Sequence, residues 1–215
     1  MNFELGLDEQ EKIDTLKEYW RRYGNLVLAV LATIAVTVSG TQWWQHMQQQ
    51  KSADAAVLYS ALQNAQLTNQ GKTVTDIAQT LMAQYPTTAY AARAALIAAA
   101  SNDQNNHPDI ARTELQWVLD HSKEAGLKAV AGLHLAAILL DQNQPASALM
   151  LLNAAHQEAF ADLYNDLKGD ALVMLHKQDE ARAAYQIALE KLPADSPYRS
   201  VIDIKLNAIA GVAAK

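Results

Sequence analysis

Histidine side chains and paired acidic side chains are the residues of this sequence that could bind a metal ion or transfer protons. No two histidines have the i, i+4 spacing with which one face of a helix binds zinc. The six are His46, His107, His121, His134, His156 and His176. The sequence has no cysteine, which excludes disulfides, thiol catalysis and zinc–thiolate sites. We therefore predict neither a metal site nor a cofactor.

Other signatures of catalysis are also missing from the sequence. There is no glycine-rich phosphate loop and no nucleophile elbow. The adjacent acids Asp179 and Glu180 come at the start of a predicted helix, where the helix dipole favours negative charge. The net charge of −6 and the lack of a basic stripe argue against nucleic-acid binding. We therefore expect a protein that is not an enzyme and that acts through a binding surface.

The segment 24–44 predicts a transmembrane helix. It contains no charged residue, and its centre, residues 26–38, reads LVLAVLATIAVTV. About 20 such residues span a bilayer as a helix. The hydroxyls of Thr33, Thr37 and Ser39 can bond to backbone carbonyls one turn earlier. The aromatic residues expected at the two membrane interfaces are Tyr19, Trp20, Tyr23, Trp43 and Trp44.

The distribution of basic residues predicts the orientation of this helix. Four of them precede it, namely Lys12, Lys17, Arg21 and Arg22, whereas only Lys51 lies in the twenty residues after it. Because the positive side of a span stays in the cytoplasm, we expect a cytoplasmic tail (1–23), the transmembrane helix (24–44) and a periplasmic domain (45–215) in the inner membrane of a Gram-negative bacterium.

Two other interpretations of the apolar segment remain open. It could be a signal peptide cleaved near residues 38–40, which are small, or a buried core helix. The long acidic tail and the Trp-Trp pair argue against cleavage, and the aromatic belt argues against a core helix.

The rest of the chain predicts an all-α stack of helical hairpins. Helices are expected at 45–65 and at about 75–84, separated by a polar loop at 68–72. Polar breaks follow at 101–109, 141–145 and 176–179, and each precedes a helix with an alanine and a large apolar residue four positions later. These pairs are Ala111/Leu115, Ala148/Leu152 and Ala181/Tyr185. A period near 34 residues made of two helices is the tetratricopeptide signature.

The last hairpin shows the packing logic most clearly. We expect Gly169 and Ala181 to lie where its two helices cross closely, Tyr185 to fill the space beside them, and Pro193 to end the second helix. The preceding hairpin lacks this tyrosine, and the first one is looser still. The stretch 196–214 is expected to be a capping helix, because the last repeat of a solenoid has one uncovered face.

The first helices of such hairpins line a groove that can hold extended segments of partner chains. The candidate groove residues are Val130, Leu133, Ala137, Leu140, Leu163, Asp166, Asp170 and Val173. Most of these are apolar, so the hypothesis is a groove for apolar segments of non-native or extended chains. The alternative is that the same residues form the core between helices.

The sequence resembles the YfgM-like family of ancillary subunits of the bacterial Sec translocon over nearly its whole length. The motifs that carry the resemblance are LKAVAGLHLA (127–136), DLKGDAL (166–172), KQDEARAAY (177–185) and IDIKLNAI (202–209). The resemblance implies a single inner-membrane anchor, a periplasmic repeat domain and association with the SecYEG channel and a PpiD-type periplasmic chaperone. It also implies that translocated chains are passed to periplasmic chaperones. A different class of function, a repeat-domain adaptor for envelope assembly or cell division, is the alternative.

Overall fold

The computed structural model describes residues 7–154 and 156–212, and every regular element in these ranges is a helix. The first six residues of the predicted tail and the end of the predicted cap lie outside them, as do the side chains of Lys12 and Tyr19. The chain divides into two units, Met1–Lys51 and Ser52–Lys215.

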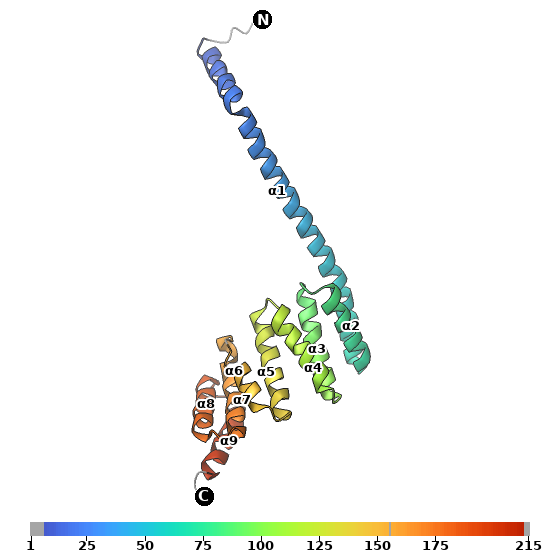
Figure 1. The fold of residues 1–215 in the computed structure, drawn as a ribbon, viewed down its shortest axis with the longest axis vertical. Coiled ribbons are helices and arrows are strands. Elements are labelled where there is room, and N and C mark those ends of the chain that lie inside the picture. Colours follow the sequence, from blue (N-terminus) through green and yellow to red (C-terminus); the bar gives the residue numbers. More distant parts are fainter. Residues whose placement is uncertain (1–6, 155, 213–215) are drawn as a thin grey trace. The chain divides into compact units, whose positions relative to one another are not determined.

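The first unit contains the N-terminal part of α1, a helix that spans Leu7–Leu67 (Figure 1). From Trp20 onward this helix is long and apolar enough to cross a membrane. As expected, the hydroxyls of Thr33 and Thr37 donate to the carbonyls of Ala29 and Thr33, each at 2.8 Å. The corresponding bond expected of Ser39 is not among those that the structure describes. Internal bonds of this kind satisfy hydroxyls that would otherwise face hydrocarbon.

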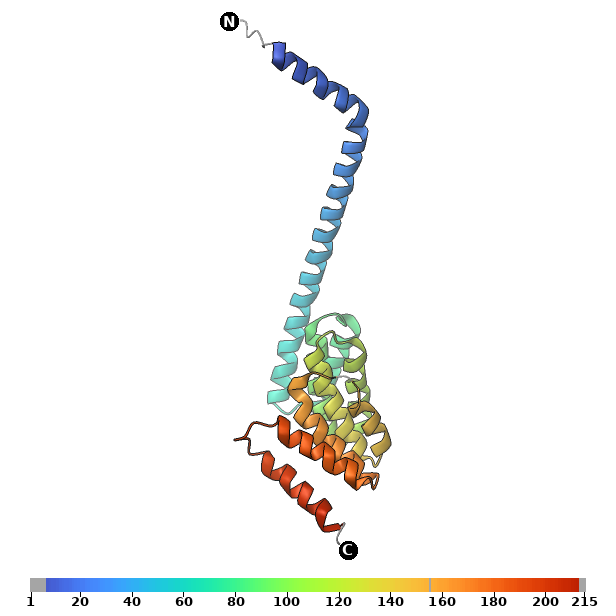
Figure 2. The same ribbon diagram turned by 90° about the vertical axis from the view of Figure 1, so that its left-hand side faces the viewer.

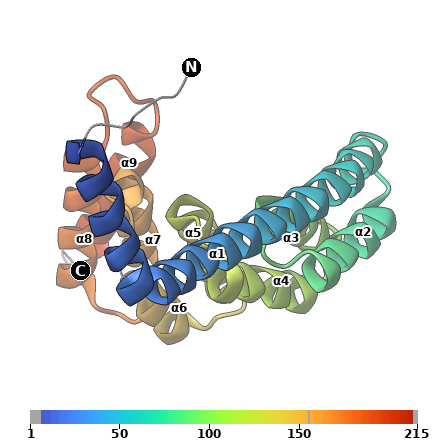
Figure 3. The same ribbon diagram turned by 90° about the horizontal axis from the view of Figure 1, so that it is seen from above.

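The second unit is a stack of antiparallel hairpins that follow one another in chain order (Figures 1 and 3). The all-α stack of helical hairpins predicted from the sequence is confirmed. After α1 the elements are α2 (Gly71–Gln84), α3 (Ala89–Gln104), α4 (Pro108–His121), α5 (Ala125–Asp141), α6 (Pro145–Leu152), the short 3₁₀ helix η1 (Glu158–Phe160), α7 (Ala161–Met174), α8 (Gln178–Lys191) and α9 (Arg199–Val212).

The turns inside the hairpins share one backbone geometry. Each contains a residue with positive φ, which is Asn69, Asn106, Asn143 or His176. The next amide then donates back into the preceding helix, as His107 N–H does to the Asn102 carbonyl at 2.8 Å. This arrangement closes the C-terminus of a helix, and asparagine tolerates it better than most residues. The end of α1 and α2 are therefore joined by the same type of turn as the three later hairpins.

Two predicted boundaries in the first hairpins were wrong. The helix α2 begins at Gly71 instead of near Thr75, because Asn69 and not the glycine makes the turn. The break predicted at 101–109 is shorter, since α3 continues to Gln104. Asn102 stays helical there because its side chain is buried and donates to the carboxylate of Glu114 on α4.

The core lies between the hairpins and follows the predicted alanine spacing. All six residues of the predicted pairs are at most 2% exposed. They are Ala111, Leu115, Ala148, Leu152, Ala181 and Tyr185. At the C-terminal end, α9 packs beside α8 (Figure 2) and buries Ile202 and Ile209. The capping helix predicted at 196–214 is thus present, although it begins at Arg199.

Candidate functional site

A cavity of about 340 Å³ lies between α5 and α7, the first helices of two successive hairpins. We call it the α5–α7 pocket. It is lined by Val130, Leu133, His134, Ala137, Phe160, Leu163, Asp166, Leu167 and Tyr198. Side chains on its rim are open to solvent, since Leu163 is 38% and Tyr198 36% exposed. A concave, mainly apolar surface with a few polar groups is the usual form of a binding site.

Helical spacing explains the two main walls of the pocket. On α5, Val130, Leu133 and Ala137 are three and four residues apart, so they lie on one face. On α7, Leu163 and Leu167 are one turn apart and face the same cavity. The remaining wall comes from η1 through Phe160 and from the segment before α9 through Tyr198.

Five of the predicted groove residues line this pocket: Val130, Leu133, Ala137, Leu163 and Asp166. The other three do not. Leu140 belongs to the buried core, Val173 is exposed elsewhere on α7, and Asp170 bonds to Lys205 and Tyr185. The structure adds four lining residues to the predicted groove set: His134, Phe160, Leu167 and Tyr198. Binding of a partner in the pocket stays a prediction.

The carboxylate of Asp166 at the pocket is held by a polar cluster. Asp166 is 2% exposed, and the Nζ atom of Lys205 on α9 lies 2.8 and 2.9 Å from its two oxygens. The hydroxyl of Tyr198 donates to the same carboxylate at 2.7 Å. Lys205 also contacts Asp170 at 2.8 Å, and Asp170 accepts a bond from Tyr185. The buried charge is therefore paired and fully hydrogen-bonded, as burial requires.

The protonation states in this cluster follow from burial and from its charges. Burial raises the pKa of the Tyr198 hydroxyl, and its bond to Asp166 raises that pKa further. Burial lowers the pKa of the Lys205 ammonium, but the bonds to Asp166 and Asp170 outweigh this and leave the pKa raised. Tyr198 is therefore neutral and Lys205 charged at physiological pH, so Asp166 offers little free negative charge to a ligand.

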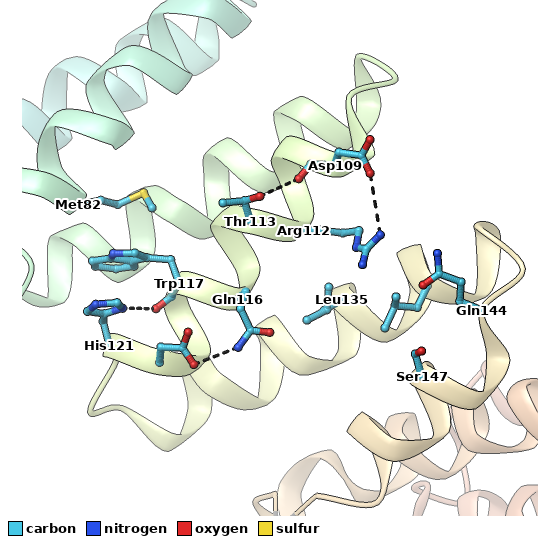
Figure 4. Close-up of a pocket in the computed structure, with 12 residues that line it drawn as sticks. Met82, Asp109, Arg112, Thr113, Gln116, Trp117, His121, Leu135, Gln144 and Ser147 are labelled. Atoms are coloured by element: carbon cyan, nitrogen blue, oxygen red, sulfur yellow. Dashed lines mark hydrogen bonds and ion pairs between the residues drawn. The ribbon is translucent and has the colours of Figure 1, made fainter.

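A second, larger cleft of about 750 Å³ lies along α4 (Figure 4). Four of its twelve lining residues are apolar (Met82, Trp117, Leu135 and Leu139), compared with six of nine in the α5–α7 pocket. Its rim is polar, and several rim groups already pair with one another, as Asp109 does with Arg112. The ring of His121 stacks on Trp117. The α5–α7 pocket is therefore the better candidate for an apolar ligand.

Glu114 on α4 is the carboxyl with the most perturbed acidity among the described residues. Burial raises its pKa to about 7, although the hydrogen bonds from Asn102 oppose the shift. The amide of Asn102 donates to both oxygens, at 3.1 and 2.9 Å, and accepts a bond from Thr75 on α2. Perturbed carboxyls often mark active sites. Here the partners are neutral and the group links three packed helices, so its role is structural.

The substitution Glu114→Gln tests this assignment through pH. The pKa of Glu114 rises on folding from 4.5 to about 7, so the free energy of unfolding falls as pH rises through this window. Below the window both states are protonated, and above it both are ionised. We expect the variant to be more stable than wild type by about 2 kcal/mol at about pH 8 and nearly equal at about pH 4. Urea unfolding followed by circular dichroism measures this. A difference that does not change with pH would contradict the assignment.

Among the side chains that the structure describes, no group of three or more histidine, aspartate or glutamate residues is arranged to hold a metal ion. The stacked pairs His121/Trp117 and His156/Tyr164 place two of the histidines against aromatic rings. These two contacts give both rings a packing role.

Comparison with known proteins gives a consistent result. A family model described as a tetratricopeptide repeat-like domain matches residues 17–211. A protein of Neisseria gonorrhoeae named ancillary SecYEG translocon subunit is 32% identical over 94% of this chain and 98% of its own length. Proteins with the same name from Haemophilus influenzae (24% identical; 94% and 97% covered) and Escherichia coli (25%; 87% and 90%) are also similar.

Proposed function

The chain belongs to the YfgM-like family of ancillary SecYEG translocon subunits, and on this premise we propose that it is a membrane-anchored scaffold of the Sec translocon that holds apolar segments of translocated chains. The α5–α7 pocket is the observation that supports the binding of apolar segments. Its lining is mainly apolar, and its one carboxylate is paired with Lys205. An extended chain leaving a channel exposes the kind of side chain that such a pocket buries favourably.

The proposed arrangement in the membrane follows the charge distribution of the sequence. Residues 1–23 form a cytoplasmic tail, residues 24–44 cross the inner membrane, and residues 45–215 lie in the periplasm. The long apolar helix that begins at Trp20 supports the anchor, and the basic residues before it support the orientation. In this arrangement the pocket faces chains that have crossed the membrane, and a PpiD-type chaperone is the partner that receives them.

We propose a non-catalytic mechanism. Two of the polar groups that line the pocket are engaged in structural bonds, since Asp166 pairs with Lys205 and the Tyr198 hydroxyl donates to Asp166. A pocket of this kind can slow the aggregation of a bound segment simply by covering its apolar side chain. Release then needs only dissociation, so the protein can pass a chain onward without an energy source.

The substitution Leu163→Glu tests the pocket directly. A glutamate at this position would place a charge on an apolar wall, and desolvating that charge opposes ligand burial. We expect at least about tenfold weaker binding of a labelled, unstructured peptide with bulky apolar side chains, which corresponds to about 1.4 kcal/mol. Fluorescence anisotropy with the full-length chain in nanodiscs measures the affinity. Since Leu163 is 38% exposed, the melting temperature should change little.

The matched control is Val173→Glu. Val173 lies on the same helix, is also 38% exposed and does not line the pocket. Equal loss of binding in both variants would mean that the pocket is not the binding surface.

Association with the translocon is tested separately by purifying the tagged full-length chain from native membranes in mild detergent. Absence of SecYEG from that preparation would contradict the scaffold proposal.

A further inference from the structure

The face of α7 beside the pocket carries three carboxylates at intervals of four residues, Asp162, Asp166 and Asp170. Among the described residues, Lys205 is the one cation that pairs with them, and it contacts both Asp166 and Asp170. Within the described part of the chain, Asp162 forms no ion pair. The cluster therefore keeps a net negative charge, and the carboxylate without a cationic partner is the one at the N-terminal end of the row.

Asp162 does not line the α5–α7 pocket itself but is a neighbour on α7 of two residues that do. It directly precedes Leu163, a lining residue, and is one turn from Asp166, another. Its charge contributes to the raised pKa of Tyr198, after burial and the effects of Asp166 and Asp170, which is consistent with a position near that wall. Asp162 is only half-buried, so a cationic group of a ligand could reach it from solvent.

We propose that the α5–α7 pocket selects segments in which a bulky apolar side chain is accompanied by a lysine or arginine. The apolar side chain enters between Val130, Leu133 and Leu163, and the cationic side chain pairs with the Asp162 carboxylate beside the pocket. This inference rests on the proposed function and specifies which segments it favours. Charge complementarity of this kind contributes to selectivity more than to total affinity.

A purely local role of Asp162 makes a different prediction. Asp162 is the second residue of α7, where a negative charge also favours the helix N-terminus. Asp179 has the same position in α8, and it does not line the pocket. The variants Asp162→Asn and Asp179→Asn therefore lose the same charge at equivalent helix positions. Only the first should change the selectivity of the pocket.

The experiment uses the full-length chain in nanodiscs of zwitterionic lipid, with empty nanodiscs as the blank. Three glycine–serine peptides carry one phenylalanine flanked by two lysines, two glutamines or two glutamates. For wild type we expect about fivefold tighter binding of the lysine peptide than of the glutamate peptide at low salt. This ratio should fall below about twofold in Asp162→Asn and at about 0.5 M salt, and it should persist in Asp179→Asn.

The outcomes separate this inference from the proposed function. Equal binding of the three peptides, still weakened by Leu163→Glu, would overturn the selectivity and leave the apolar pocket intact. No binding of any peptide would overturn both proposals. A lysine preference that survives in Asp162→Asn, or that Asp179→Asn removes equally, would assign the effect to the overall negative charge of the chain and overturn the role of Asp162.

Discussion

Replacing Gly169 with alanine is expected to lower the free energy of unfolding by about 2 kcal/mol, although alanine is the stronger helix former. A Cβ atom built at Gly169 overlaps the ring of Tyr185 on α8. Tyr185 cannot easily move away, because it is 2% exposed and its hydroxyl donates to Asp170 at 2.7 Å. The added methyl group must therefore push α7 and α8 apart, and the lost packing exceeds the gain in helix propensity.

The control for this prediction is Gly126→Ala. Gly126 lies in the first turn of α5, where an added Cβ atom would only touch the side chain of Gln157 at 3.6 Å. That variant should be neutral or slightly stabilised. Thermal and urea unfolding of both full-length variants, followed by circular dichroism, give the comparison. If Gly169→Ala were as stable as Gly126→Ala, the close crossing of α7 and α8 would not limit the packing.

The close approach of α7 and α8 at Gly169 could be predicted from the sequence. A similar close contact, between Gly132 on α5 and Tyr164 on α7, could not. Gly169, Ala181 and Tyr185 belong to one hairpin and match its repeat pattern, so their spacing was informative. The middle hairpin was expected to lack such a tyrosine. In the structure, a Cβ atom at Gly132 would lie 2.5 Å from the hydroxyl of Tyr164, which comes from the next hairpin. Repeat spacing within one hairpin does not reveal a side chain supplied by its neighbour.

The same distinction applies to the α5–α7 pocket. Its helical walls follow from the periodicity of apolar residues, and Val130, Leu133 and Leu163 were predicted in this way. Tyr198 was missed because it precedes α9 and reaches Asp166 from 32 residues away. Lys205 comes from still further along the chain. Contacts of this length depend on how the cap docks onto the last hairpin, which single-sequence patterns do not encode.

Docking of the cap leads to the second large effect, which is expected for Asp166→Ala. This change removes the buried acceptor of both Tyr198 and Lys205. Deleting one partner of a buried ion pair leaves the others without full compensation, so we expect a loss of about 3 kcal/mol. Because Lys205 lies on α9, the substitution should increase the hydrogen-exchange rate, relative to wild type, more in α9 than in α3 or α4.

Asp170→Ala is the matched comparison for this prediction. Asp170 is one turn further along α7 and contacts the same lysine at the same 2.8 Å, but its side chain is 30% exposed whereas that of Asp166 is 3% exposed. Solvent can replace much of what this carboxylate provides to Lys205, but the Tyr185 hydroxyl loses its acceptor, so we expect a loss of about 2 kcal/mol. A smaller effect for Asp166→Ala would mean that burial beside the pocket does not strengthen the bond between Lys205 and α7. Peptide binding to the two variants gives a further comparison. If Asp166→Ala weakens it and Asp170→Ala does not, the buried Asp166 carboxylate holds Tyr198 in place as a wall of the pocket. The cap and the binding site are then energetically coupled.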